Sequence, residues 1–234
     1  MADLAAAAGV SRTSFYRAFE SRDALLEALE VAPEPGAGER ILAAALKLVG
    51  AHGLGELSMD ELAGQAGVSR ATLYRLFPGK GPLFTSLVRA YSPLEPVSRL
   101  VATMQSEPPD VVMPEIARTA YRTIFGRGES RIGLVRALFF EISSLAPDTA
   151  DAAQVAIRGI VGSLAVYLMA QMDAGRLRRM DPLLALQSFV GPIFFHMMTR
   201  PLAEKVLGLE IGGEAAVTQL AEGWLRAMRS DEHE

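Results

Sequence analysis

The sequence predicts an all-α protein, and three observations support this prediction. Segments with apolar residues three and four positions apart recur along the chain, as expected for helices that bury one face. From Pro93 onward, no run alternates apolar and polar residues as a half-buried strand would. Proline, glycine and short polar stretches separate the periodic segments, which places turns between helices.

Two short helices joined by a tight turn are predicted within Ser58–Lys80. Ser58 and Glu61 have the spacing of a capping box, so a helix is expected to begin there. Gly67 follows where the chain must turn, because glycine accepts the left-handed backbone that other residues resist. Ser69 is a favourable N-cap for the second helix. The segment therefore has the pattern of a helix-turn-helix.

The second helix is expected to divide its side chains between a core and an open face. Leu73, Leu76 and Phe77 can face inward. The residues left to face outward are small, hydroxyl-bearing, aromatic or basic: Arg70, Ala71, Thr72, Tyr74 and Arg75. Such a face suits the major groove of DNA better than a protein core. A helical hairpin with exposed polar residues and no role in DNA binding is the alternative.

The residues GVSRATLYRLFPGK resemble the recognition segment of the TetR family of bacterial transcriptional regulators, and the resemblance extends over Glu39–Tyr91. It implies a helix-turn-helix DNA-binding domain followed by a helical ligand-binding and dimerisation domain. It also implies that Tyr74 and Lys80 contact DNA phosphates. Because arginine reads guanine and a threonine methyl packs on thymine, Arg70 and Thr72 are the expected base contacts. The full set of expected DNA-binding residues is Ser58, Ser69, Arg70, Ala71, Thr72, Tyr74, Arg75 and Lys80.

The N-terminus repeats this motif, because MADLAAAAGVSRTSFYRAF aligns without gaps to MDELAGQAGVSRATLYRLF. Residues 1–31 are thus a partial duplicate that lacks the amphipathic helix preceding the intact copy. A second DNA contact would use Ser11, Arg12, Ser14, Tyr16, Arg17 and Arg22. Through Glu34, however, six acidic residues outnumber three arginines, which disfavours contact with phosphates. A domain that continues upstream, a remnant docked on the intact domain and a decaying duplicate all fit this pattern.

The intact motif lies in a domain with clear limits. Residues 32–38 are a predicted linker, since their prolines and glycines cannot continue a helix. The DNA-binding domain is expected at 39–92, with further helices at Glu39–Ala51 and at about 81–91. The whole chain has a net charge of −4, yet six bases and four acids occur within 38–92. That local excess is useful, because phosphate contacts need only a few bases.

The second domain is expected at 93–230, followed by a tail at 231–234. Its predicted helices are Val97–Met104, Val111–Phe125, Arg131–Leu145, Thr149–Ala174, Pro182–Thr199 and Glu214–Arg229. Pro192 lies inside one of them and is expected to kink it. Large apolar side chains in the last two helices suit a four-helix interface across a two-fold axis, as the resemblance also implies. The expected interface residues are Phe189, Ile193, Met197, Val217, Leu220, Trp224 and Met228, with ordinary intramolecular core as the alternative.

Aromatic and methionine side chains cluster in the middle helices, where they can line an adaptable apolar pocket. The resemblance implies that an inducer binds there. The expected ligand-binding residues are Arg118, Tyr121, Arg122, Phe125, Phe139, Phe140, Tyr167, Met169, Phe195 and His196. Core packing is the alternative for each apolar member, and a structural role is the alternative for His196.

Composition argues against several other classes of function. The chain has no cysteine, so it has no disulfide frame and no thiolate metal site, as befits a cytoplasmic protein. Its three histidines are scattered, and no phosphate-binding glycine loop, metal-spaced His/Glu pair or nucleophile elbow occurs. Neither an enzyme nor a cofactor or metal is therefore predicted. The most apolar stretch, Ile160–Met172, is too short to span a bilayer, so no membrane segment is expected.

The predicted function is that of a sequence-specific DNA-binding transcriptional regulator. We expect a ligand-responsive repressor that binds a palindromic operator as a homodimer. Its expected partners are double-stranded DNA, a small apolar effector and a second copy of the chain. The alternative is a helical dimer that acts through a protein partner and has weak or lost DNA binding, which the acidic N-terminal copy keeps open.

Overall fold

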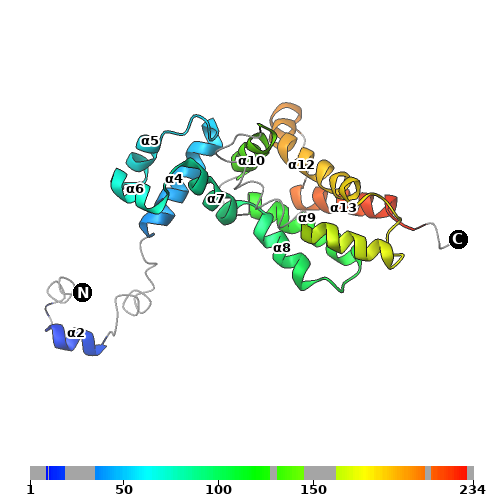
Figure 1. Cartoon of the computed structure of the whole chain (residues 1–234), viewed down its shortest axis with the longest axis horizontal. Coiled ribbons are helices and arrows are strands. Elements are labelled where there is room, and N and C mark those ends of the chain that lie inside the picture. Colours follow the sequence, from blue (N-terminus) through cyan, green and yellow to red (C-terminus); the bar gives the residue numbers. More distant parts are fainter. Residues whose placement is uncertain are drawn as a thin grey trace. The chain divides into compact units, whose positions relative to one another are not determined.

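The computed structural model describes residues 9, 11–18, 35–126, 131–144, 162–208 and 212–230. Within these residues every regular element is a helix (Figure 1), which confirms the all-α prediction. Met1–Arg40 and Ile41–Glu234 form two separate compact units. Some predictions fall outside the described residues: those for Arg22, for linker residues 32–34, for the start of the helix expected at Thr149–Ala174 and for the tail at 231–234.

The first unit contains α2 (Arg12–Ala18), whose bounds match those of α6 (Arg70–Leu76) in the gapless alignment. Gly9 and Gly67 occupy equivalent positions and have φ angles of 66° and 62°. The Ser11 Oγ accepts a hydrogen bond from the Ser14 N–H at 3.1 Å. The Ser69 Oγ does the same for the Thr72 N–H, also at 3.1 Å. The duplicate therefore repeats the turn, the cap and the helix of the intact copy.

Four helices form the segment predicted to bind DNA, hereafter the DNA-binding segment: α4 (Ala37–His52), α5 (Met59–Gln65), α6 and α7 (Lys80–Tyr91). Their inner faces share one core of buried apolar side chains that includes Ile41, Ala45, Leu48, Leu62, Leu73, Leu83, Phe84 and Leu87. These positions recur at helical spacing within each helix, which is why the sequence pattern locates the helices well. Since α6 contributes only its inner edge to this core, its other side is open.

The core of the DNA-binding segment extends beyond residue 92, because α10 (Ile132–Ser144) also packs into it. Leu134, Ala137 and Leu138 are buried among residues of α4 and α7. A Cβ placed on Gly133 would lie 2.6 Å from backbone atoms of Gly50, so α10 and the end of α4 meet at backbone distance. Gly133 thus allows a contact between α10 and the end of α4 that a larger residue at position 133 would prevent.

The remaining helices form the body: α8 (Leu94–Thr103), α9 (Pro109–Phe125), a helical segment at 162–173, α12 (Pro182–Leu207) and α13 (Gly213–Ala227). Helix α9 packs on both α8 and α13, and α13 packs on α12. Their shared core includes Met113, Ile116, Ile124, Leu164, Leu168, Val217 and Trp224. Helix α8 begins directly after Pro93, earlier than the predicted Val97.

Helix α12 differs most from its prediction. It continues through Pro192 and Pro201 to Leu207, well beyond the expected end at Thr199. The stop is supplied by Gly208, whose φ of 63° is left-handed. Among the described residues, α12 is the one helix long and apolar enough to cross a membrane, by length and composition alone. Because helices from the cores of soluble proteins pass the same test, this is weak evidence for a membrane span.

Candidate nucleic-acid interface and apolar cavity

The turn between α5 and α6 has the caps that the sequence predicts. Ser58 is the N-cap of α5, and its Oγ accepts a hydrogen bond from the Glu61 N–H at 3.4 Å. Ser69 is the N-cap of α6 and serves the Thr72 N–H in the same way. The left-handed Gly67 joins the two helices. These local bonds fix the angle at which α6 leaves the turn.

Helix α6 has one buried edge and one open face. Leu73 is fully buried, and Phe77 follows it into the core. Tyr74 is 47% exposed, and Arg70, Ala71 and Arg75 are exposed as well. The prediction that Leu76 faces inward is wrong, because this side chain is 41% exposed at the last residue of α6. A helical face holds residues four apart, so Leu73 and Phe77 share the inner edge and Leu76 lies beside it.

Arg70 forms an ion pair with Asp60 of α5, and both side chains are largely exposed. Exposed pairs of this kind stabilise proteins by only about 0–1 kcal/mol. The Arg70 guanidinium can therefore exchange its carboxylate partner for a guanine edge at little cost. In contrast, Arg75 makes no side-chain hydrogen bond or ion pair with the described part of the chain, so it is free to reach a phosphate or a base.

Lys80 is placed differently from the other basic residues. Its Nζ donates hydrogen bonds to the carbonyl oxygens of Gly55 at 2.8 Å and Leu54 at 3.4 Å. The ammonium group thus ties the loop before α5 to the start of α7. An ammonium has three donors, so one is left for another acceptor. The predicted phosphate contact by Lys80 remains a prediction.

The N-terminal copy presents the same kind of face on α2. Tyr16 is half exposed, and Ser14 and Arg17 are exposed. The Arg12 side chain and the whole of Arg22 lie outside the described residues. The exposed residues of α2 therefore match those of α6 in type and position, while a DNA contact by this copy stays a prediction.

A cavity of about 540 Å³ lies between α8, α9, α10, the 162–173 segment and α12. Its walls are aliphatic and aromatic, with Val97, Ile116, Leu164, Phe189, Ile193, Phe194 and Met197 among them. Among the described residues that line it, only Gln187 has a polar side chain. Leu138 also lines the cavity and belongs to the core of the DNA-binding segment. The cavity wall and that core thus share a side chain.

Phe139 is the one residue of the predicted ligand-binding set that lines this cavity. The two arginines of that set form ion pairs outside this cavity. Arg118 pairs with Glu115 at 2.7 Å, and Arg122 pairs with Glu214 of α13. His196 has a buried Nε2 without a hydrogen-bond partner, and burial lowers its pKa. The sequence shows that these side chains are polar. It does not show that Glu115 and Glu214 form ion pairs with the two arginines.

The other aromatic members of that set, and Met169, lie outside the cavity. Tyr121 stacks on Phe125 with ring centroids 4.9 Å apart. The Tyr167 hydroxyl donates to the carbonyl of Glu107 at 2.9 Å, and burial raises the pKa of Tyr167 to about 12. Phe140, Met169 and Phe195 are exposed. Aliphatic residues form most of the cavity wall instead, and Phe189, Ile193 and Met197 of the predicted interface set also line it.

The predicted interface residues lie largely inside the chain's own core. Phe189, Ile193, Met197, Val217, Trp224 and Met228 are buried, and Leu220 is partly buried against them. Trp224 packs edge to face on Phe189, and its Nε1 donates to the Ser188 Oγ at 2.9 Å. Since α12 is apolar all round, spacing alone could not tell its inner stripe from its outer one. The residues that α12 leaves exposed are Leu184, Phe195, Leu202 and Val206, among others.

Residues 1–29 and 41–87 match the family model described as "Bacterial regulatory proteins, tetR family". The fold is similar to PfmR, a TetR family transcriptional regulator from Thermus thermophilus, with 19% identity and a TM-score of 0.62 over 80% of this chain and 97% of that chain. It is also similar to the transcriptional regulator FadR from Bacillus subtilis, solved in complex with stearoyl-CoA, with 17% identity and a TM-score of 0.62 over 81% and 98%. The fold is also similar to a putative TetR-family regulator from Mesorhizobium loti, with 21% identity and a TM-score of 0.56 over 82% of this chain and 94% of that chain. No curated protein matches the chain.

Proposed function

We propose that this chain, which belongs to the TetR family of bacterial regulatory proteins, is a ligand-responsive repressor that binds a palindromic operator as a homodimer. Members of that family are DNA-binding transcriptional regulators and not enzymes. The observation that carries the finer proposal is the open face of α6, where Arg70, Tyr74 and Arg75 are exposed on a helix fixed by two serine caps.

The DNA contacts follow from the geometry of α6. Arg70 lies in its first turn and would bind a guanine. Replacing that guanine with another base would weaken binding by about 1–3 kcal/mol. Tyr74 and Arg75 lie one turn later and would hold phosphates, which set the register without reading sequence. Such phosphate contacts make affinity fall steeply with salt. The Asp60 carboxylate beside Arg70 would be displaced toward solvent on binding.

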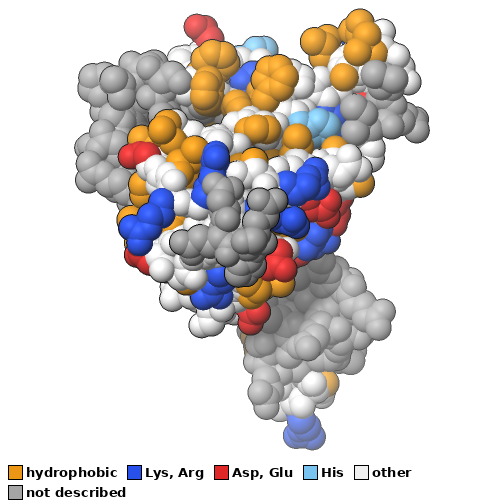
Figure 2. Space-filling model, turned by 90° about the vertical axis from the view of Figure 1, so that its right-hand side faces the viewer, with side chains coloured by type: hydrophobic (Ala, Val, Ile, Leu, Met, Phe, Trp, Pro, Cys, Tyr) orange, Lys and Arg blue, Asp and Glu red, His pale blue; other side chains and the backbone are white. Residues whose placement is uncertain are grey.

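One short helix makes few contacts, so a second copy of the chain is needed to reach a specific affinity. We propose that the outer stripe of α12 forms the dimer contact. Leu184, Phe195, Leu202 and Val206 are each more than half exposed, and their separations place them on one side of the helix. Hydrophobic side chains also gather along the upper part of the face in Figure 2. Contiguous apolar surface of this kind typically marks an interaction site.

The effector would occupy the apolar cavity. Its volume of about 540 Å³ is within the range of small-molecule sites. With Gln187 as its polar side chain, the cavity offers no counter-charge, so burial of an ionised group would be costly. An elongated hydrocarbon group fits this lining. The stearoyl-CoA complex of FadR, which has a similar fold, supports this choice.

A filled cavity can act on the DNA-binding segment through α10. Leu138 contributes to the cavity wall and to the core beneath α6, and the Arg136 Nη2 donates to the Gly50 carbonyl at 3.1 Å. Displacement of α10 would therefore move the end of α4. Because half-sites lie about 34–36 Å apart, a small rotation is enough to lose one of them. The loss of DNA affinity cannot exceed the difference between the effector's affinities for the two conformations of the chain.

A gel-shift titration of the full chain against its own promoter region, repeated at several salt concentrations, tests this function. Binding that prefers one palindrome and weakens as salt rises from about 50 to 200 mM supports the proposal. A chain that forms dimers but shows no preference for any fragment would favour action through a protein partner. The hydrogen bonds from Lys80 to backbone carbonyls favour that second function, because they engage a cation that was expected to contact phosphate. For either function, we propose a cytoplasmic protein.

A further inference from the structure

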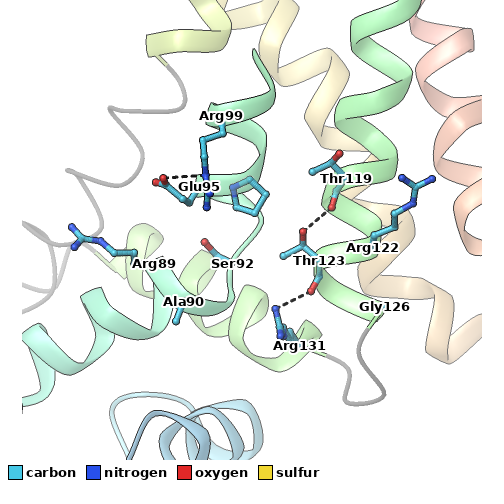
Figure 3. A pocket seen from close by; sticks show the side chains of 11 residues that line it. Arg89, Ala90, Ser92, Glu95, Arg99, Thr119, Arg122, Thr123, Gly126 and Arg131 are labelled. Carbon is cyan, nitrogen blue, oxygen red and sulfur yellow. Dashed lines mark hydrogen bonds and ion pairs between the residues drawn. The ribbon is translucent and has the colours of Figure 1, made fainter. Parts of the chain in front are cut away.

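A second cavity, of about 550 Å³, is polar and lies where the end of α7 meets α8 and α9 (Figure 3). Arg89 comes from α7, Arg99 from α8, Arg122 from α9, and Arg131 immediately precedes α10. Glu95 is the one acidic residue among the described residues that line it. This cavity is distinct from the apolar one, since the two have no lining residue in common.

The charge of this cavity is opposite to that of the chain. The chain has 27 acidic and 23 basic residues, whereas four arginines and one glutamate line the cavity. A concave site lined by one sign of charge concentrates its field and attracts counter-ions. The local charge therefore selects an anion.

The floor of the cavity offers fixed donors. Ser92 is only 1% exposed, and its Oγ accepts a hydrogen bond from the Leu94 N–H at 3.3 Å. The hydroxyl hydrogen of Ser92 has no acceptor among the described residues, so it is available to a ligand. Arg131 is held by a hydrogen bond from its Nη1 to the Thr123 carbonyl at 3.3 Å and by the Tyr91 ring 5.0 Å below its guanidinium. Its other guanidinium donors remain free.

The rim of the cavity carries arginines that can turn toward a ligand. Arg89 forms no hydrogen bond or ion pair with the described part of the chain, and Figure 3 shows it extended away from Ser92. Arg99 pairs with Glu95 at 3.4 Å, and both side chains are mostly exposed, so the pair is weak. Arg122 turns away toward α13, where Glu214 holds it. Arg89 and Arg99 are thus the movable cations.

We propose that this cavity binds a phosphate-bearing small molecule. Ser92 and Arg131 would donate hydrogen bonds to its phosphate oxygens, and Arg89 and Arg99 would swing inward to neutralise it. Guanidinium groups suit this role because their paired donors match phosphate geometry. The cavity is larger than one phosphate ion, which leaves room for a second phosphate or an organic part. Because Arg89 belongs to α7 and Arg99 to α8 of the body, the ligand would also tie the DNA-binding segment to the body; this consequence rests on the proposed function.

Calorimetric titration of the full chain with inorganic pyrophosphate and with ADP, in the absence of DNA, tests the site. We expect one molecule bound per chain, with an affinity that falls as salt rises. The double variant R89Q/R99Q should weaken binding at least about tenfold, because each lost charge-assisted bond has a large effect. The matched control R179Q/R226Q removes two exposed arginines outside the cavity and should leave affinity unchanged. Tighter binding of ADP indicates an organic phosphate, and equal binding indicates inorganic phosphate.

Three results would overturn the site: neither probe binds, the control loses as much affinity as R89Q/R99Q, or the variant R75Q on α6 abolishes binding. The last result would place the anion on the DNA-binding face. Ser92→Ala, which removes the buried hydroxyl, should weaken binding while the arginines remain. The titration contains no DNA, so a chain that binds no operator can still bind pyrophosphate or ADP. The proposed anion site and the proposed DNA-binding function are therefore tested independently.

Discussion

Replacing Gly133 with alanine should disturb the contact between α10 and the end of α4. The added Cβ would lie 2.6 Å from both the Cα and the carbonyl oxygen of Gly50. These are backbone atoms, so the clash cannot be relieved by a side-chain rotation, and one helix must shift. Overpacking of this kind costs about 1–3 kcal/mol. Gly133 is only the second residue of α10, where the gain in helix propensity on replacing glycine is small.

Gly64→Ala is the matched control for this substitution. Gly64 lies in α5, which shares a core with α10, and a Cβ there would meet nothing within 4 Å. Alanine should therefore stabilise the helix by about 0.5–1 kcal/mol. Urea unfolding followed by circular dichroism would measure both changes, with constant m-values showing that the midpoints report stability. If Gly133→Ala proves as stable as Gly64→Ala, the close approach of α10 and α4 is wrong, and so is the coupling route through α10.

Four further predictions concern separate parts of the chain. Arg70→Ala should cost about 1–3 kcal/mol of binding and relax specificity at one base pair; equal loss on every DNA sequence would refute base reading. Leu202→Glu should give monomers in sedimentation velocity, because it places a charge in the proposed α12 interface, whereas Leu207→Glu, on another side of the helix and equally exposed, should not. Deleting residues 1–36 should leave operator affinity unchanged, since acids outnumber arginines there, and a fall in affinity would show that α2 touches DNA. Burial lowers the pKa of His196 below 6.5, so the unfolded chain binds that proton more readily and stability should fall as the pH drops below about 6.5; His196→Gln should reduce this fall, and an unchanged pH profile would contradict the shift.

Local features of the DNA-binding segment could be predicted from the sequence because their causes are local. The serines at 58 and 69 cap the helices that follow them, and Gly67 supplies the left-handed turn. Each of these effects depends on residues within three or four positions. The duplication of cap, turn and helix in α2 was visible for the same reason.

Features that depend on distant partners could not be predicted. Leu138 and Gly133 lie far along the chain from α4, and nothing in their own pattern shows that they complete its core. The sequence presents Lys80 as a free cation, because the loop carbonyl that accepts its hydrogen bond belongs to Gly55, 25 positions away. On α12, apolar residues surround the helix, so the buried stripe could not be separated from the exposed one by periodicity.

The spacing of half-sites in DNA selected from random fragments tests the central claim most directly. If the open face of α6 enters the major groove and α12 joins two subunits, the selected fragments should contain two inverted copies of one short motif. The centres of the two copies should be about one helical turn, or 34–36 Å, apart. A single undivided motif, or fragments without any common motif, would contradict the account.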